Sequence, residues 1–363
     1  MAIQTDYFDI LVIGAGAMGA AIAFKFIESG LKVGLIDRRA IGQNASGKNA
    51  GNLNPLLKTP PEMINSAIKS MSLHKQLKNK LINLGCSNYL LEKANRILLA
   101  FDTKDEEYNK TVIDLFNKYG PEFSGKIIGP EEIKSIDPRI TQSAISAAYL
   151  TGNMAIDTYA FNHALVDGFR KLGGIFLSTE AKGIRQSLHG LKITTHLGDL
   201  HSEKLILATG PWVEFIKNEL EIKIPISPLK GELLRAYLPG NKFTHDLTYK
   251  ETSIYQRSKS NEIWLGGTNE DAGLDEKINP SSRSDILNRV AKIFPEIKNA
   301  VILEHTAAIR SVHKNGTPFF KNIKDNENIF IANGGSWKGM LFSPIISELA
   351  FEKIMMNKNS KLN

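Results

Sequence analysis

Three glycines and one acidic residue near the N-terminus have the types and spacing that bind a dinucleotide. Gly14, Gly16 and Gly19 follow one apolar run, and Asp37 ends the next one. Gly14 permits a tight turn, Gly16 lets the backbone approach a pyrophosphate, and Gly19 lets a helix pack closely on the preceding strand. A carboxylate at the position of Asp37 accepts hydrogen bonds from a ribose. The pattern predicts a nucleotide-containing redox cofactor and leaves FAD and NAD as alternatives.

The residues around these glycines must form a strand, a helix and a second strand. The first apolar run does not alternate with polar residues, which is typical of a buried parallel strand. A helix is predicted over 17–29, and its first residues, Ala17 and Met18, would direct backbone amides at the phosphates. The carboxylate of Asp37 disfavours a 2′-phosphate on the ribose. Arg38 follows directly, and its positive charge weakens this argument.

Length and composition indicate a globular chain with two domains. The 363 residues exceed one comfortable core, and the 42% hydrophobic and 23% charged residues are ordinary proportions. The single cysteine, Cys86, excludes an internal disulfide and a cysteine-based metal cluster, and the histidines show no ligand-type spacing. No signal peptide and no bilayer-spanning apolar run is recognisable. We expect a cytoplasmic protein, with peripheral attachment to a membrane as an alternative.

The net charge of +7 raises the question of a nucleic-acid partner. The basic residues are spread along the chain, and the densest cluster, from Lys69 to Lys80, is interleaved with apolar residues at helical spacing. These lysines therefore form the solvated face of a predicted helix, and a nucleic-acid partner is not expected.

The rest of the chain alternates between helical and strand-like patterns. Residues 62–145 are predicted to be largely helical, and further helices are predicted over 158–172, over 280–294 and from Ser343-Pro344 onward. Strands are predicted over 174–185, 191–196, 200–208, 232–238, 253–257 and 262–267. The last two strands form a predicted hairpin.

Four further segments complete a pattern that runs through nearly the whole chain. They are NASGKNAG at 44–51, GNMAID at 152–157, LILATGPW at 205–212 and GGSWKGM at 334–340. In this order, and together with the N-terminal glycine turn, they resemble the D-amino-acid oxidase superfamily, with glycine oxidases and sarcosine oxidases as the most similar members. The resemblance favours FAD over NAD.

The resemblance implies an α/β fold in two parts. A Rossmann-like FAD-binding domain of the glutathione-reductase type would comprise residues 1–85, 146–217 and 306–363. An inserted α+β domain, built on an antiparallel sheet, would comprise 86–145 and 218–305 and would cover the flavin on the substrate side.

The resemblance also implies which residues contact FAD. Outside the glycine turn, these are Ser46, Asn49, Ala50, Gly51, Ala181, Ala208, Thr209, Gly210, Trp212, Gly335, Ser336, Lys338, Gly339 and Met340. The turn at 335–340 would direct amides at the N1/C2-carbonyl edge of the flavin, where negative charge gathers on reduction. Lys48 stands where related dehydrogenases carry a flavin-linked histidine, and Cys86 is remote from the C-terminal motif, so non-covalent FAD is predicted.

Arg310 is the strongest candidate for binding the substrate. It lies in a segment that resembles the family's Gly-Leu-Arg-Pro…Asp-Gly-x-Pro pattern, whose arginine holds the substrate carboxylate; Ala308, Ser311 and Asn315 replace family residues there. A guanidinium suits this role because its fork matches a carboxylate bidentately and its charge is fixed. The alternative is a structural ion pair.

Three other side chains are candidates for the chemistry. Tyr255 stands two residues after Ser253, which occupies the position of the family's substrate-contacting tyrosine, and would share its face of a strand. Tyr255 is either a hydrogen-bond donor to the substrate or a packed aromatic. Lys230 and Lys338 are cationic candidates for assisting oxygen reduction near the flavin.

The predicted reaction is FAD-dependent oxidation of a small amino acid or N-methyl amine. A hydride equivalent would pass to flavin N5, giving an imine and, with O2, hydrogen peroxide. The alternatives are a dehydrogenase of the same fold that reduces a carrier or quinone, and a tRNA-modifying oxidase of carboxymethylaminomethyl-uridine. An NAD-dependent dehydrogenase or a non-catalytic nucleotide-binding protein is a further alternative, and a homo-oligomer is possible for each.

Overall fold

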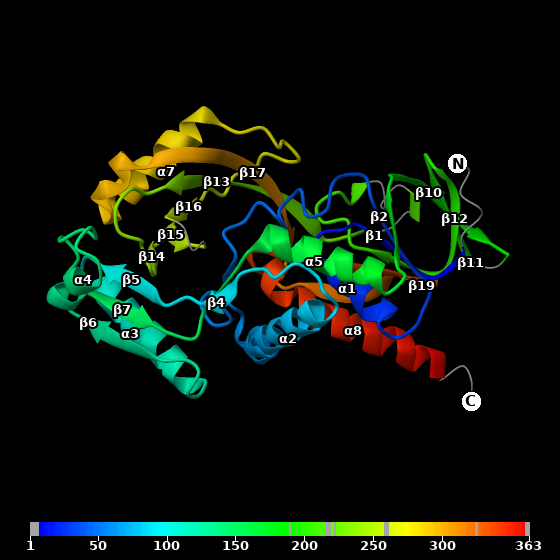
Figure 1. Ribbon diagram of the computed structural model, residues 1–363, viewed down its shortest axis with the longest axis horizontal. Helices are drawn as coiled ribbons and strands as arrows, with labels where there is room; N and C mark the ends of the chain where they lie inside the picture. Colours follow the sequence, from blue (N-terminus) through cyan, green and yellow to red (C-terminus); the bar gives the residue numbers. More distant parts are fainter. Residues whose placement is uncertain are drawn as a thin grey trace.

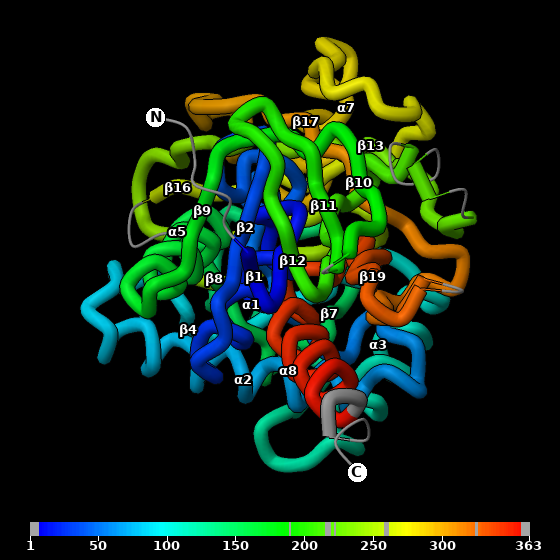
Figure 2. Tube along the Cα trace, turned by 90° about the vertical axis from the view of Figure 1, so that its right-hand side faces the viewer, coloured from blue at the N-terminus to red at the C-terminus, as the bar shows by residue number. Residues whose placement is uncertain are grey.

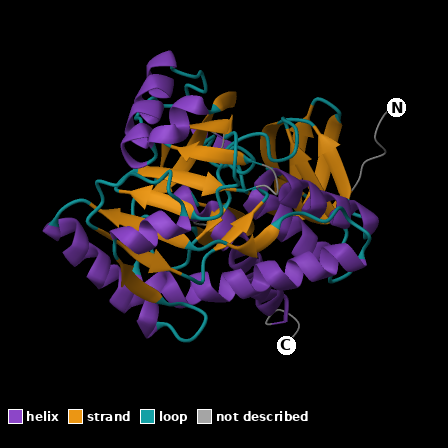
Figure 3. Ribbon diagram, turned by 60° about the vertical axis from the view of Figure 1, so that its left-hand side comes forward, coloured by secondary structure: helices purple, strands orange, loops and turns teal. Residues whose placement is uncertain are grey.

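Two large β-sheets and the helices around them form the molecule (Figure 1). The computed structural model describes residues 7–188, 190–214, 219–220, 223–257, 261–323 and 326–359. Each large sheet has eight strands in the described part of the chain, and a third sheet of three strands lies between the other elements. The helices lie on the outer sides of the strands (Figure 3). This mixed α/β architecture agrees with the predicted fold class.

The first sheet is built from strands that are far apart in the sequence. Its strands are β1 (Tyr7–Ile13), β2 (Val33–Asp37), β9 (Ile175–Ser178), β10 (Ala181–Ser187), β11 (Gly190–Thr195), β12 (Gly198–Leu207), β18 (Phe319–Ile323) and β19 (Asn326–Asn333). The central order is β12-β1-β2-β9, with all pairs parallel. β12 pairs antiparallel with β11 along its first half and parallel with β19 along its second half. Figure 2 shows β1, β2 and β12 side by side.

Three helices cover one face of this sheet, α1 (Ala17–Ile27), α5 (Thr158–Lys171) and α8 (Gly339–Asn359), and α2 (Ile64–Asn83) packs on α8. Their apolar residues share one core with those of β1 and β2, including Phe24, Phe161 and Phe342. Asp157 caps α5 by accepting a 2.9 Å hydrogen bond from the backbone N–H of Ala160, as its position before an amphipathic pattern predicts. The other face packs on the β10–β11 hairpin through Ile184 and other apolar residues.

The last helix begins earlier than the sequence predicts, at Gly339 rather than at Ser343. Pro344 lies inside the helix and cannot donate a hydrogen bond to the carbonyl four residues before it, that of Met340. Two other donors replace the missing one. The Ser343 hydroxyl lies 2.9 Å from the Met340 carbonyl oxygen, and Nε2 of His74 lies 3.0 Å from it. The helix therefore continues through the proline without leaving a buried carbonyl unsatisfied.

The second sheet has the order β17-β13-β16-β15-β14-β5-β7-β6. Its strands are β5 (Arg96–Ala100), β6 (Gly125–Ile128), β7 (Ser146–Leu150), β13 (Ile226–Tyr237), β14 (Asp246–Tyr249), β15 (Thr252–Gln256), β16 (Glu262–Gly266) and β17 (Val301–His313). α7 (Pro280–Ile293) packs on one face through Ile286, Val290 and Ile293. α3 (Thr103–Lys118) packs near β5 and β7 on the other face, and α4 (Pro130–Ile136) lies beyond β6. The small sheet joins β3 (Asn52–Leu53), β8 (Met154–Ile156) and β4 (Leu91–Lys93).

The prediction of a largely helical region over 62–145 is wrong beyond α2, because β4, β5 and β6 lie within it. All five residues of β5 are buried between β14 and β7, so this strand has no alternation that would distinguish it from a buried helix. The predicted strand over 174–185 is two strands, β9 and β10. The hairpin of β15 and β16 is confirmed, with Ser253 paired to Gly266; residues 258–260 of its connection lie outside the described residues.

The division into two domains stays a prediction. The predicted boundary at 306 falls within β17, and β7 of the second sheet begins at the predicted boundary at 146. The described residues include no helix whose length and apolarity would suit a membrane-spanning segment.

Candidate active site

A cavity of about 1480 Å³ lies between the two large sheets. It extends from the carboxyl ends of β1 and β2, at Gly14 and Asp37, to Asp105 and Tyr108 on α3. The strand ends of an open α/β sheet are the usual position for a nucleotide. The second sheet forms the roof through Leu233, Tyr255 and Arg310, among other residues. Its volume exceeds that of a typical small-ligand pocket and leaves room for a large cofactor together with a substrate.

The predicted cofactor residues converge on this cavity from five parts of the chain. All of these residues except Gly19 line the cavity. A Cβ atom on Gly19 would collide with the carbonyl oxygen of Gly14, so Gly19 allows the close approach of α1 to the turn that the sequence predicts. Gly14 has φ +108° and lies against the carbonyl of Ala208, so a side chain there would be both strained and obstructed.

The carboxylate of Asp37 is held at the end of β2 by two backbone amides. It accepts hydrogen bonds from Ala15 at 2.7 Å and Arg39 at 2.8 Å. Burial raises the pKa of Asp37, and the two amides and the neighbouring arginines oppose this shift. The guanidiniums of Arg38 and Arg39 lie 5.3 and 4.9 Å from the ring centre of Trp212. Arg39 also forms an ion pair of 2.6 Å with Glu276, which joins this end of the cavity to the segment before α7.

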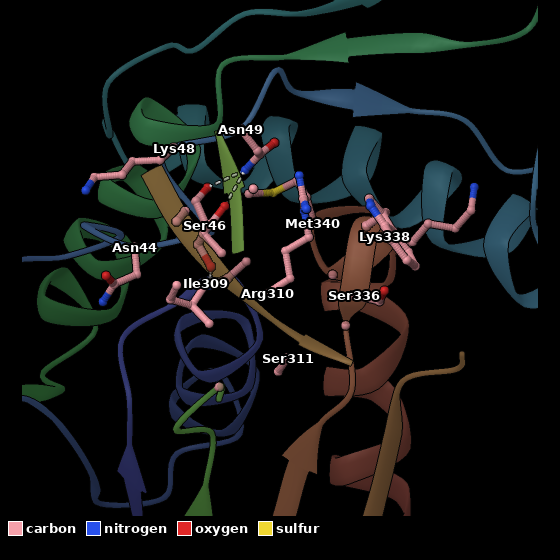
Figure 4. Close-up of a pocket in the computed structure, with 18 of the residues that line it drawn as sticks. Asn44, Ser46, Lys48, Asn49, Ile309, Arg310, Ser311, Ser336, Lys338 and Met340 are labelled. Carbon is pink, nitrogen blue, oxygen red and sulfur yellow. Dashed lines mark hydrogen bonds between the residues drawn. The ribbon is translucent and has the colours of Figure 1, made fainter. Parts of the chain in front are cut away.

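The loop over 44–51 is fixed by its own side chains (Figure 4). The Asn49 amide nitrogen donates to the carbonyls of Ala45 and Ser46 at 2.8 and 2.9 Å, and its carbonyl oxygen accepts from Gly51 at 3.0 Å. The Ser46 hydroxyl accepts from the backbone N–H of Ala17 at 2.9 Å, so the loop is attached to the N-terminus of α1. This hydrogen bond places the loop beside the glycine turn on the cavity wall.

Two buried hydroxyls on the cavity wall indicate that it binds a polar ligand. Thr209 Oγ1 and Ser336 Oγ have no hydrogen-bond partner among the described residues, and both residues line the cavity. A buried polar group without a partner is costly unless a ligand supplies one. Ser336 also has φ +46°, a left-handed conformation that is uncommon outside glycine and recurs at ligand sites. The hydroxyls of Thr209 and Ser336 fit a cofactor that is rich in oxygen and nitrogen acceptors.

Arg310 projects from β17 into the cavity (Figure 4). Its Nη1 donates to the side-chain oxygen of Asn269 at 2.9 Å and to the carbonyl of Thr268 at 3.3 Å, and Trp337 Nε1 donates to the same Asn269 oxygen at 3.2 Å. No acidic side chain of the described residues forms an ion pair with Arg310. Burial lowers the pKa of Arg310 to about 10, so the guanidinium stays protonated at neutral pH. A half-buried guanidinium that faces a cavity without an acidic partner is suited to binding an anion.

Tyr255 lies on the same wall beside two buried arginines that the sequence analysis missed. The guanidiniums of Arg96 and Arg257 lie 5.6 and 5.0 Å from its ring centre. Both form ion pairs with Asp246, at 3.0 Å from Arg96 and 2.7 Å from Arg257. Although burial alone would raise the pKa of Asp246, the two guanidiniums hold it below its usual range. Arg96 directly precedes the apolar run of β5. Because a helix was predicted over this region, the sequence did not indicate which face the Arg96 side chain would occupy.

Lys338 lies on the cavity wall, whereas Lys230 does not. The ammonium of Lys338 donates to the carbonyl of Asn54 at 2.7 Å. Burial, together with the charges of Arg96 and Lys58, lowers the pKa of Lys338 to about 7. Lys230 lies on the opposite face of β13 from Gly231, buried in an ion pair of 3.2 Å with Glu232. This position gives Lys230 no contact with the cavity.

Lys48 and Cys86 are the two residues that bear on covalent attachment of FAD. Lys48 lines the cavity, and its ammonium lies 3.4 Å from the carbonyl of Ala307. Cys86 is buried and is not part of the cavity wall. Within the described part of the chain, no group of histidine, cysteine and acidic side chains has the arrangement of a metal site.

Comparisons with known proteins identify the family. The family model described as FAD dependent oxidoreductase (DAO) matches residues 9–353. Glycine oxidase of Geobacillus kaustophilus (strain HTA426) is 24% identical over 363 residues, which cover 97% of this chain and 94% of that protein. The crystal structure of glycine oxidase from Geobacillus kaustophilus has a TM-score of 0.89 at 22% identity, covering 96% of this chain and 94% of that chain. That of L-proline dehydrogenase from P. horikoshii has a TM-score of 0.85 at 23% identity, covering 98% and 95%.

The family match decides between FAD and NAD, which the glycine turn alone left open. The likeness to the solved structures extends over both large sheets and agrees with the predicted fold. Because the family model spans nearly the entire sequence, the chain belongs to the DAO family of FAD-dependent oxidoreductases.

Proposed function

We propose that this enzyme oxidises the C–N bond of a small amino acid or N-alkyl amino acid whose carboxylate binds to Arg310. The observation that carries the proposal is the half-buried guanidinium of Arg310, which projects into the cavity and forms no ion pair with the described acidic residues. Glycine oxidase and L-proline dehydrogenase, by their names, act on amino acids, and their similarity to this chain supports the same substrate class.

FAD, when held in this cavity, would supply the acceptor for a hydride equivalent from the substrate carbon. The roles proposed for the protein are binding and orientation. Arg310 would hold the carboxylate bidentately, and Asn269 and Thr268 would fix the plane of the guanidinium. The Tyr255 hydroxyl would donate a hydrogen bond from the same wall. Positioning of this kind supplies much of the rate without a dedicated base.

The residues predicted to contact FAD keep that role as part of the proposal. The glycine turn and Asp37 would bind the pyrophosphate and ribose, and Thr209 and Ser336 would find their missing hydrogen-bond partners on the cofactor. Lys338 would place a positive charge near the flavin and assist reduction of the acceptor. Oxygen and a protein or quinone carrier are both compatible with the site, since one of the similar proteins is named an oxidase and another a dehydrogenase.

Anaerobic visible spectroscopy of the purified holoenzyme tests the proposal. We expect glycine, sarcosine, a D-amino acid or proline to bleach the flavin absorbance. Arg310→Leu should raise the substrate concentration for half-maximal bleaching by at least about 100-fold, since a buried charge-assisted pair is lost. The flavin spectrum before addition of substrate should be unchanged, which verifies cofactor binding. Unaltered substrate affinity in Arg310→Leu would refute the assignment of the carboxylate site.

A second measurement distinguishes the acceptors. An oxidase should release about one equivalent of hydrogen peroxide per turnover in air, whereas a dehydrogenase should turn over only with an artificial dye or quinone.

A further inference from the structure

The substrate end of the cavity has more positive charge on its wall than one carboxylate would neutralise. Three cationic side chains line it there, Arg96, Arg310 and Lys338, and Arg257 lies beside Tyr255 without lining the cavity. The buried acid among them is Asp246, which is 1% exposed and is shared by two of the arginines. The ion pairs between Lys58 and Glu251 and between Lys250 and Asp105, farther along the wall, are each internally balanced.

Arg96 has the features of an incompletely satisfied ligand-binding group. It is 4% exposed, lines the cavity, and uses Nη2 to contact Asp246 at 3.0 Å. Its Nε is buried without a hydrogen-bond acceptor among the described residues. Asp246 is already held by Arg257 at 2.7 Å and 3.0 Å through two nitrogens. The carboxylate therefore neutralises Arg257 most directly, and the charge of Arg96 is left largely uncompensated.

Arg96 and Arg310 are on opposite sides of Tyr255 along the second sheet. Arg310 is on β17, Tyr255 on β15 and Arg96 on β5, and all three line the same cavity. The ring of Tyr255 is 5.6 Å from the Arg96 guanidinium, and Tyr255 and Arg310 line the same cavity. Five strand spacings of about 4.8 Å separate the backbones, and the long arginine side chains reduce the gap between the two guanidiniums. A ligand that contacts both must carry its anionic groups several bonds apart.

We propose, building on the amino-acid oxidation proposed above, that the substrate is an amino dicarboxylate whose second carboxylate binds to Arg96. Arg310 receives the carboxylate next to the amine, and the amine lies beside Tyr255. The cavity continues past Arg96 to Thr248 and to Asn109 of α3, so the second acid group has space along the wall. Two separated cationic anchors favour a dianion over a monoanion of the same length.

Ligands that lack an amine test this binding without turnover. The oxidised holoenzyme is titrated with succinate, glutarate, adipate and pentanoate, and binding is followed by the perturbation of the flavin spectrum. At least one dicarboxylate should bind about tenfold more tightly than pentanoate or better. In Arg96→Met this preference should disappear, while the affinity for pentanoate changes less than about threefold. Arg96→Lys should retain part of the preference because it keeps the charge.

The outcomes separate this inference from the proposed function. If pentanoate perturbs the flavin but no dicarboxylate binds more tightly to the wild-type enzyme, the second anionic subsite is refuted and the carboxylate site at Arg310 stands. If no carboxylate perturbs the flavin, both are refuted. Flavin content and melting temperature of each variant verify the fold. If Arg96→Met does not fold, the affinities of the wild-type enzyme for dicarboxylates and pentanoate still decide whether the second subsite exists.

Discussion

The guanidinium of Arg310 lies against Gly231, in the space that a side chain at this position would need. The two residues belong to neighbouring antiparallel strands, β17 and β13, where Leu229 is the direct partner of Arg310. Gly231 is thus the residue that lets the Arg310 guanidinium lie flat on the sheet. The arginine is recognisable from its sequence motif. The role of the glycine is not, because the contact between the two residues depends on the register of β13 and β17.

Gly231→Ala should displace the Arg310 guanidinium and weaken substrate binding. We expect KM to rise by at least about tenfold, with a smaller change in the limiting rate of flavin reduction. Gly183→Ala is a matched control, since a Cβ atom at this strand position of β10 would have only ordinary contacts. Equal KM values for Gly231→Ala and wild type would show that Arg310 does not bind the substrate from this position.

Lys338 should make carboxylate binding dependent on pH. Its pKa of about 7 means that the ammonium is charged below neutrality and loses its charge as the pH rises. The affinity for an anionic ligand should therefore fall as pH increases through about 7, because the protonated form attracts the ligand. Spectral titration with pentanoate between pH 6 and pH 9 measures this effect. Lys338→Met should show weaker binding with little dependence on pH over the same range.

His74 should make the folded protein sensitive to acid. It is buried, and burial lowers its pKa to about 4, while the unfolded chain takes up the proton near the usual value of about 6.5. The unfolded state therefore binds more protons between these values, and stability rises with pH across this window and is lost on acidification. The loss on going from about pH 6.5 to about pH 4 is on the order of 3 kcal/mol.

His74→Gln tests this origin of the acid sensitivity. A glutamine amide can donate to the Met340 carbonyl, as His74 Nε2 does at 3.0 Å, but it does not titrate. Chemical denaturation at several pH values should give a shallower dependence of the unfolding free energy in this variant. An unchanged slope would assign the acid sensitivity to other groups.

FAD should be released when the protein is denatured. Lys48 lines the cavity but cannot form the histidyl linkage of related dehydrogenases, and Cys86 lies outside the wall. Acid precipitation should leave the flavin in the supernatant, and a denaturing gel should show no fluorescent protein band. A fluorescent band would identify a covalent attachment that these residues do not explain.

Local sequence patterns identified the segments that meet at one end of the cavity. The glycine turn, Asp37 and the motif at 205–212 are contiguous segments whose glycines are required by backbone geometry, and all of them reach the cavity. The substrate end was less predictable. Arg96, Asp246 and Gly231 acquire their roles from pairing between strands far apart in the sequence, and β5 is a fully buried strand without alternation.

Lys230 shows a second limit of prediction from sequence. Neighbouring residues of a strand point to opposite faces, and a motif match does not tell which face meets the cavity. Gly231 lies on the cavity side, which places Lys230 in the ion pair with Glu232. Predictions of a homo-oligomer and of a cytoplasmic location stay predictions.

The pairing of β12 with β1, β11 and β19 has a consequence for synthesis of the protein. The glycine turn is synthesised well before β12, the neighbour of its strand, and β19 and Met340 follow later still. A nascent chain therefore carries an exposed, apolar parallel strand for most of translation. Because Met340 and the glycine turn line the same cavity, a chain that stopped before Met340 would lack part of the cavity wall, and added cofactor could not restore it.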